Sequence, residues 1–338
     1  MKEIKTYIYS SDISIVIQGP LYRNPRSKNH IGILETLPFV KRNFPDAEII
    51  ISTWEEEDTE GLEVDKIIKS KDPKGFVDKN KSNRNFNRQI ISTREGIIQA
   101  SRPYVLKTRA DIIFTSPEIA QIASKRGELL LKTPITLTNM VFRNHYKIPF
   151  LFHPSDVVQF GVREDLLDIW DIPLEEFSEV ATDGKKNVLF RYSSSCFKYH
   201  PEQSMCTRWL NKHGFDIHLK GPSQISYDLF KIWEKVLINN FHIVDYEKSG
   251  IKFPHHFYNS AYGTKSLLTN SNLKKISNKL VQNKDNQKLR YWGLWMNKYI
   301  LAFTKKTYLL SLVANLVFVF SPTLNQKIFA LYRKVRPR

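Results

Sequence analysis

Residues 104–111, YVLKTRAD, form the stretch that decides the fold of this chain. They begin with side chains that are typical of a buried strand, expected over residues 104–109, and they end at Asp111. Because side chains alternate along a strand, Lys107, Arg109 and Asp111 are expected on one face. Two cations and a carboxylate on one face suit a diphosphate, with or without a metal ion. The simpler interpretation, an ion pair between Arg109 and Asp111, stays open.

The segments before this stretch alternate between two patterns. Short apolar runs at residues 13–17, 48–52 and 65–69 are typical of buried strands, and each ends in polar or turn-forming residues. Residues 33–44 and 86–100 have helical patterns. Alternating strands and helices predict an α/β fold with an open, mostly parallel sheet and helices on both faces. The chain has no Gly-x-Gly-x-x-Gly fingerprint and no Walker loop, which argues against the usual dinucleotide and ATP sites.

Polar side chains that follow the strands are candidates for a ligand site, because ligands of such sheets bind beyond the carboxyl ends of the strands. Residues 83–89, NRNFNRQ, add amides and guanidinium groups just before a predicted helix. Asn85 or Asn87 can simply cap that helix, but a nucleotide would use such groups for base, ribose and phosphate contacts. The predicted ligand-binding residues are Gln18, Gly19, Pro20, Thr53, Asp72, Asn87, Arg88, Gln89, Lys107, Arg109 and Asp111.

The second half of the chain is less regular and offers two carboxylates for proton transfer. We expect two strands and two helices here, at residues 136–142, 156–161, 163–170 and 201–213. Asp156 precedes an apolar run, and Glu202 opens the last of these helices. Either can take a proton from a hydroxyl group. The alternatives are an Asx-turn or a cap for Asp156 and a favourable helix-dipole position for Glu202.

Residues that could bind a metal are few. Asp111 is the first candidate, and His255, in the cluster FPHHFY at residues 253–258, is a weaker one because such a loop is more often structural. The two cysteines, Cys196 and Cys206, lack zinc-site spacing and fit a reducing compartment. No Ser-His-Asp, Cys-His or His-Glu-x-x-His arrangement is present, which weakens a hydrolase interpretation. A divalent cation, Mg²⁺ or Mn²⁺, stays open as a cofactor, and no pattern points to an organic cofactor.

The net charge of +17 comes almost entirely from the C-terminal part. From Lys248 onward there are 17 Lys and Arg residues against one acidic residue, Asp285, whereas the preceding part holds 34 basic and 33 acidic residues. A nearly neutral body with a basic tail fits an anionic membrane surface better than it fits nucleic acid. We therefore predict two regions, 1–246 and 247–338, with a polar linker at 266–288.

The most apolar part of the basic extension is residues 308–320, which is shorter than the ~20 residues that span a bilayer. Aromatic residues precede it and Lys and Arg residues follow it, so we expect amphipathic helices that lie in the membrane interface. A core helix hairpin is the alternative. Residues 1–12 contain no apolar run of the kind found in signal peptides. We therefore expect a cytoplasmic protein associated peripherally with the inner face of the plasma membrane.

Seven segments within residues 13–210 also carry a family resemblance: ISIVIQGP (13–20), FPDAEIIISTW (44–54), VDKIIKSKDP (64–73), NRQIIST (87–93), YVLKTRAD (104–111), HPSDVVQFG (153–161) and, more weakly, PEQ (201–203). Together they resemble the WavE lipopolysaccharide-synthesis family, bacterial glycosyltransferases with a GT-A-like, Rossmann-type domain. The resemblance implies transfer of a sugar from a nucleotide-activated donor to a lipopolysaccharide or capsular polysaccharide acceptor, free or lipid-linked, at the cytoplasmic membrane face.

The resemblance also implies roles for the candidate residues. The ligand-binding residues would hold the donor, and Asp156 or Glu202 would act as the base. In GT-A enzymes a strand-end Asp-x-Asp binds metal and nucleotide, but here Arg109 occupies the first acidic position and only Asp111 matches. Arg109 is therefore expected to take over part of the cation's role. The alternative function is a non-catalytic, membrane-associated scaffold of a polysaccharide-synthesis complex, and nucleic-acid binding through the tail is the least favoured.

Overall fold

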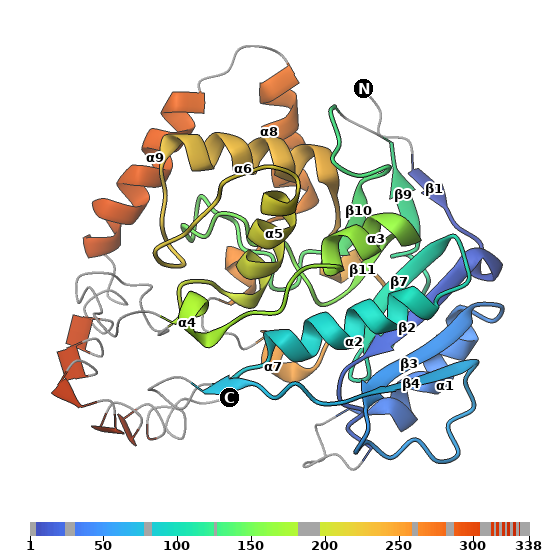
Figure 1. Ribbon diagram of the computed structural model, residues 1–338. Coiled ribbons are helices and arrows are strands. Elements are labelled where there is room, and N and C mark those ends of the chain that lie inside the picture. The colour runs from blue at the N-terminus through green and yellow to red at the C-terminus, as the bar shows by residue number, and fades with distance from the viewer. Residues whose placement is uncertain are drawn as a thin grey trace.

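A seven-stranded sheet forms the centre of the computed structural model (Figure 1). The structure describes residues 5–23, 31–77, 83–124, 127–181, 197–258, 263–281 and 287–304, and short stretches after residue 311. The strands lie in the order β12-β10-β11-β7-β2-β3-β4. Their bounds are β2 (Ile13–Gln18), β3 (Glu48–Trp54), β4 (Lys66–Ser70), β7 (Tyr104–Arg109), β10 (Ile135–Thr138), β11 (Gln159–Val162) and β12 (Phe241–Val244).

Six of these strands run parallel to one another, and β11 runs against them. β7 lies between β2 and β11, with Arg109 opposite Gln18 on one side and Lys107 opposite Gln159 on the other. The carboxyl ends of β2, β3 and β7 therefore meet at one edge of the sheet. The predicted open, mostly parallel, Rossmann-type sheet is confirmed.

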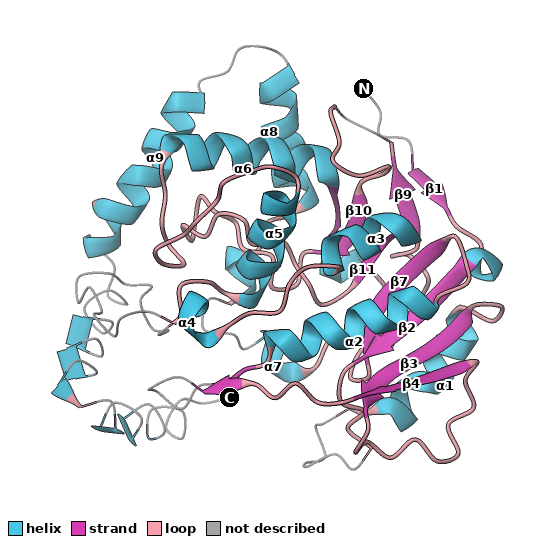
Figure 2. Cartoon of the chain, in the orientation of Figure 1, coloured by secondary structure: helices cyan, strands magenta, loops and turns pink. Residues whose placement is uncertain are grey.

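Helices cover both faces of this sheet (Figure 2). Val16 and Ile50 pack with Ile90 of α2 on one face, whereas the neighbouring Ile15 packs with α1 on the other, as the alternation of side chains requires. Gly96 lets α2 approach the sheet, because a Cβ atom there would lie 2.4 Å from a methyl group of Val16. The α-helices are α1 (Ile33–Asn43), α2 (Phe86–Gln99), α3 (Arg163–Trp170), α4 (Phe177–Val180), α5 (Pro201–Lys212), α6 (Tyr227–Asn240), α7 (His255–Tyr258), α8 (Asn270–Val281) and α9 (Gln287–Tyr299).

Short elements border the main sheet. Three pairs of strands form small two-stranded sheets: β1 (Lys5–Tyr7) with β9 (Gln121–Ala123), β5 (Phe76–Val77) with β6 (Asn83–Arg84), and β8 (Ile113–Phe114) with β13 (Ile251–Lys252). Single 3₁₀ turns occur at η1 (Ser10–Asp12), η2 (Tyr246–Lys248), η3 (Thr264–Ser266) and η4 (Leu301–Thr304). The pair β8–β13 brings a segment from the basic extension back to the end of β7.

Two expected strands of the second half are shorter than their patterns indicated. β10 ends at Thr138 because the chain turns there, with the amide of Phe142 donating to the carbonyl of Asn139 and Val141 at φ 69°. β11 begins at Gln159 because the preceding loop is held elsewhere, since the Ser155 hydroxyl donates to the carbonyl of Met140. The loop that carries Asp156 therefore lies at the carboxyl edge of the sheet, where the parallel strands end.

The expected polar linker at residues 266–288 is wrong, because α8 occupies most of it. Leu273 and Ile276 of α8 are buried in the same hydrophobic cluster as Leu237 of α6 and Leu294 of α9. Apolar side chains at helical spacing thus outweigh the Asn- and Lys-rich composition that suggested a linker. The division into regions 1–246 and 247–338 stays a prediction, and these contacts join residues from both regions.

Residues 308–320 lie largely outside the described residues. Within the described part of the chain, every helix is too short or too polar to cross a bilayer.

Candidate active site at the carboxyl edge of the sheet

The two candidate bases come together at the carboxyl edge. Asp156 lies in the loop before β11, and Glu202 lies in the first turn of α5. The Nε2 group of Gln89, in the first turn of α2, donates to Oδ2 of Asp156 over 2.6 Å. Burial, and then the nearby charge of Asp156, raise the pKa of Glu202 well above its usual range. The two carboxylates therefore act on each other, and Glu202 retains its proton more strongly than an exposed glutamate does.

Lys107 contacts the loop that carries Asp156. Its side chain is fully buried, its ammonium group donates to the backbone carbonyl of Asp156, and it lies 4.7 Å from the centre of the Trp170 ring. Burial lowers the pKa of Lys107 to about 8. Lys107 shares the α2 face of β7 with Arg109, as expected. Its contacts place it under the loop that carries Asp156, where it fixes that loop.

Two histidines beside Glu202 were not identified from the sequence. Nε2 of His153 lies 3.6 Å from Oε2 of Glu202, and the rings of His153 and His200 are 5.4 Å apart. Burial lowers the pKa of His200 to about 4 and, with the neighbouring His200 and Arg143, lowers that of His153 well below its usual value. Both imidazoles are therefore neutral at pH 7. The signal was the repeated His-Pro pair, HPSD and HPEQ, with an acidic residue close behind each.

His153, His200 and Glu202 also form a set of potential metal ligands. Each offers one ligating atom, and these atoms all lie within 4.8 Å of one another. Nδ1 of His153 and Nε2 of His200 are buried without a hydrogen-bond partner among the described residues. Neutral imidazoles and a carboxylate are ligands that divalent transition metals accept. The metal candidate His255 lies in α7, is exposed, and is not part of this set.

Arg109 and Asp111 form the ion pair that the sequence left open. β7 ends at Arg109, and Asp111 reaches back from the following turn, so that both of its oxygens accept from the guanidinium group, over 2.8 and 2.7 Å. The Asp111 side chain is 6% exposed and that of Arg109 is 28% exposed. The carboxylate is therefore covered, whereas the Arg109 side chain is partly exposed and its guanidinium carbon lies 5.5 Å from the centre of the Phe257 ring.

Gln18, Gly19, Pro20 and Thr53 lie next to this pair, where β2 and β3 end. Oε1 of Gln18 accepts from the Ser92 hydroxyl, and the Thr53 hydroxyl donates to the carbonyl of Gly19. Gly19 has φ 90°, a conformation that favours glycine, and Pro20 after it is exposed. These contacts fix the turn after β2 beside Arg109.

Residues 83–89 make contacts with two different parts of the protein. Arg88 binds both oxygens of Asp72, over 2.7 and 2.6 Å, and this contact contributes most to lowering the pKa of Asp72 to about 2. Asn87, in contrast, is buried and exchanges two hydrogen bonds with the backbone of Glu175. Arg88 and Gln89 therefore lie at the carboxyl edge of the sheet, whereas Asn87 fixes the backbone of the segment before α4.

Comparison with known proteins gives a match to a family model. No curated protein matches the chain. The family model described as WavE lipopolysaccharide synthesis matches residues 13–318. The match starts at β2 and runs past α9, so it includes the sheet, the candidate site and most of the basic extension, and it extends beyond the residues 13–210 that carried the resemblance. The chain therefore belongs to the WavE lipopolysaccharide-synthesis family.

Proposed function

We propose that this protein is a glycosyltransferase that moves a sugar from a nucleotide-activated donor onto a lipopolysaccharide or capsular polysaccharide acceptor. The observation that carries this proposal is the convergence of Asp156, Glu202 and the Arg109–Asp111 pair at the carboxyl edge of the sheet. This is where sheets of this kind bind nucleotides. A mostly parallel sheet with one inserted antiparallel strand also supports the GT-A-like interpretation.

The proposed reaction is a single displacement. The Asp156–Glu202 pair takes the proton of the acceptor hydroxyl, whose oxygen then forms a bond to the anomeric carbon of the donor while the bond to the nucleotide diphosphate breaks. Arg109 and Arg88 are paired with Asp111 and Asp72, but each guanidinium group keeps further N–H donors that would stabilise the charge developing on the leaving diphosphate. A panel of nucleotide sugars tested by calorimetry separates this proposal from a scaffold role, because a scaffold binds none of them.

We also propose that Arg109 carries more of the countercharge than a metal ion does. Both oxygens of Asp111 accept from Arg109, so a Mg²⁺ or Mn²⁺ ion at Asp111 would have to displace that guanidinium group. Arg109→Ala is expected to lower kcat/KM about 100-fold, because loss of one donor to a developing anion costs ~3 kcal/mol. Chelation with EDTA should have a smaller effect.

Steady-state kinetics of the purified variant checks this prediction. Arg94→Ala is a matched control, because Arg94 pairs with Glu95 on α2 and its side chain is also 28% exposed. A rate that falls further with EDTA than with Arg109→Ala would show that a cation carries most of the charge.

We propose that the basic extension binds an anionic membrane through α9. Leu289, Trp292, Met296 and Ile300 follow one another at helical spacing, and their exposed fractions are 66, 54, 44 and 47%. Two charged side chains of α9 point inward, since Arg290 binds Glu234 over 2.7 Å and Lys298 is buried, whereas Lys288 is exposed. The apolar face of α9 is thus exposed on the part of the chain that carries the excess of positive charge, as in helices that lie on membranes.

Trp292→Glu with Met296→Glu should reduce flotation with phosphatidylglycerol vesicles about tenfold or more, because two charges would have to enter the membrane interface. Leu34→Glu is the control, since Leu34 is 51% exposed on α1 at the other end of the chain. Equal flotation of the double variant and the control would contradict membrane binding through this face.

A further inference from the structure

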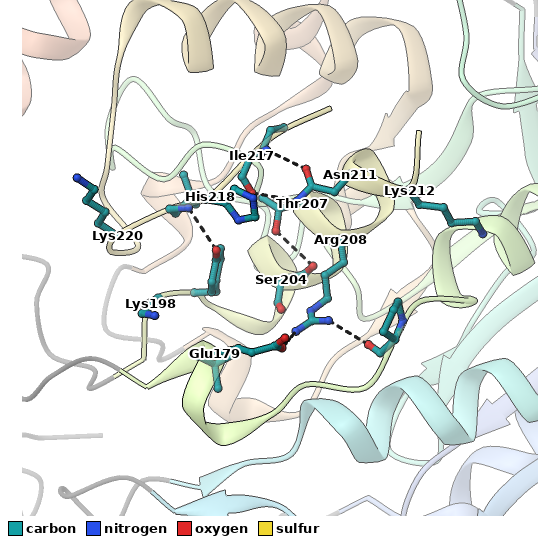
Figure 3. A pocket seen from close by; sticks show the side chains of 14 residues that line it. Glu179, Lys198, Ser204, Thr207, Arg208, Asn211, Lys212, Ile217, His218 and Lys220 are labelled. Atoms are coloured by element: carbon teal, nitrogen blue, oxygen red, sulfur yellow. Dashed lines mark hydrogen bonds and ion pairs between the residues drawn. The ribbon is translucent and has the colours of Figure 1, made fainter. Parts of the chain in front are cut away.

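A pocket of about 980 Å³ lies beside α5 (Figure 3). Ser204, Thr207, Arg208 and Asn211 line it and form one face of α5, since they follow a spacing of three and four residues. Glu202 lies about 200° around the helix from Ser204, on the opposite face. The volume is within the range of sites for small organic ligands.

The walls of this pocket are positively charged. Lys198, Arg208, Lys212 and Lys220 line it, against the single carboxylate of Glu179. Arg208 binds Glu179 over 2.6 Å, and Lys212 binds Asp168 over 2.9 Å, so these two cations are already neutralised. Among the described residues, the ammonium groups of Lys198 and Lys220 form no hydrogen bond and no ion pair, although the charge of Lys198 helps to lower the pKa of Glu179. In Figure 3 they lie toward the same end of the pocket, away from Lys212.

The remaining walls suit a saccharide and are already in place. Asn211 exchanges two hydrogen bonds with the backbone of Ile217, over 3.1 and 2.9 Å, and so fixes the far wall. The hydroxyl groups of Ser204 and Thr207 donate to Glu175 and to the carbonyl of Gln203, and both residues are buried, so they form a fixed floor under the pocket. The Tyr199 ring adds an apolar surface. Polar groups beside an aromatic ring are what a sugar with hydroxyl and C–H faces requires.

We propose that this pocket binds an anionic group, a phosphate or a carboxylate, carried by the saccharide acceptor. This assignment rests on the proposed glycosyl transfer for the word acceptor, but the pocket and its charge do not depend on it. Lys198 and Lys220 supply the charge-assisted hydrogen bonds, and the floor of α5 contacts the sugar. Because α5 is about 10 Å thick, the anionic group lies away from the hydroxyl that reacts at Glu202. The pocket therefore selects the acceptor and takes no part in bond formation.

Calorimetry without any donor tests the proposal with three probes: lactose 1-phosphate, lactobionate and lactose. At low ionic strength we expect at least one of the two anions to bind about tenfold more tightly than lactose, and added salt to reduce this difference. Tighter binding of the phosphate or of the carboxylate would support the proposal and identify the group. Equal binding of all three would overturn it, and so would inorganic phosphate that binds as tightly as lactose 1-phosphate, since that result shows a plain anion site.

Lys198→Gln with Lys220→Gln should weaken binding of the preferred anion about tenfold, to the level of lactose. Lys5→Gln with Lys252→Gln removes the same charge from two exposed strand positions outside both sites, and it should change binding less than twofold. If the two double variants behave alike, the pocket is not the site.

These outcomes are distinct from failure of the proposed function. A protein that binds lactose 1-phosphate through Lys198 and Lys220 but binds no nucleotide sugar would keep the pocket and lose the glycosyltransferase assignment. A protein that transfers sugar but binds the three probes equally would lose the pocket only. In an active protein, the double variant should raise KM for an anionic acceptor more than it lowers kcat, as expected for a contact remote from the reacting bond.

Discussion

Glu202→Gln is expected to lower kcat about 1,000-fold, since general-base catalysis contributes 10²–10⁴-fold and the amide cannot take a proton. The substitution keeps the size of the side chain. Burial and the charge of Asp156 already favour the uncharged form of Glu202 in the folded protein. A neutral Gln should therefore change the free energy of unfolding by less than about 1 kcal/mol. The loss of rate would then report on chemistry and not on folding.

Glu164→Gln is the matched control for this experiment. Glu164 also lies in the first turn of a helix, α3, and its side chain is 54% exposed. If Glu202 matters only because a carboxylate favours a helix N-terminus, the two variants should lose similar stability and little activity. Kinetics and urea unfolding of both proteins decide between these cases, and a variant of Glu202 that keeps more than a tenth of the rate is incompatible with a base at this position.

The dependence of the rate on pH gives a second test of Glu202. A base is active when it is deprotonated, and the pKa of Glu202 lies well above its usual range. The wild-type kcat/KM should therefore rise with pH through the neutral range, and not level off above pH 5 as it would for an ordinary glutamate. This rise of kcat/KM with pH should be absent from the residual activity of Glu202→Gln. A wild-type profile that is flat from pH 5 to 8 would count against the assignment.

The sequence predicted the sheet because its strands carry local signals. β2, β3 and β7 are apolar runs that stop at polar residues, and this pattern defines both a buried strand and its exposed end. The same reasoning placed Arg109 and Asp111 together but could not decide whether they bind each other or a ligand. Alternation fixes a face, whereas an ion pair depends on where the strand ends and how the next turn is shaped.

Other parts of the site depend on contacts between distant segments. Lys107 was expected to face a ligand, but Trp170 and the loop of Asp156, both more than forty residues away in sequence, cover it. His153 and His200 meet only because β11 and α5 reach the same edge of the sheet. α6 was not predicted, although its sequence carries a local signal. Ser226 caps the helix, and Phe230, Trp233 and Leu237 follow at helical spacing.

Arg84→Met is expected to lower the free energy of unfolding by about 3–5 kcal/mol, the largest effect on stability among these variants. Arg84 binds both oxygens of Glu175, over 2.6 and 2.5 Å, and the two side chains are 3 and 0% exposed. Removal of the guanidinium group would leave a buried carboxylate whose remaining side-chain donor, among the residues that the structure describes, is the Ser204 hydroxyl. Such a charge has lost the partner that compensated for its removal from water.

Urea unfolding measures this effect against an exposed pair. Lys41 and Glu63 are 3.2 Å apart, with side chains 42 and 89% exposed, so Lys41→Met should change the free energy of unfolding by less than about 1 kcal/mol. If both variants lose the same small amount, the buried pair contributes no more than a surface contact. A combined Arg84→Met and Glu175→Leu variant should regain much of the loss, because two apolar side chains leave no unpaired charge.

The same double variant can show whether the buried pair also positions the proposed base. Arg84 donates to the carbonyl of Tyr199 over 2.7 Å, three residues before Glu202, and Glu175 accepts from Ser204 two residues after it. Both partners thus hold the start of α5, and an apolar pair would fill the space without these directed contacts. We expect the double variant to recover most of its stability but to keep kcat about tenfold below the wild type, because small displacements of a positioned group are costly in rate. Recovery of stability and rate together would show that packing alone sets the position of Glu202.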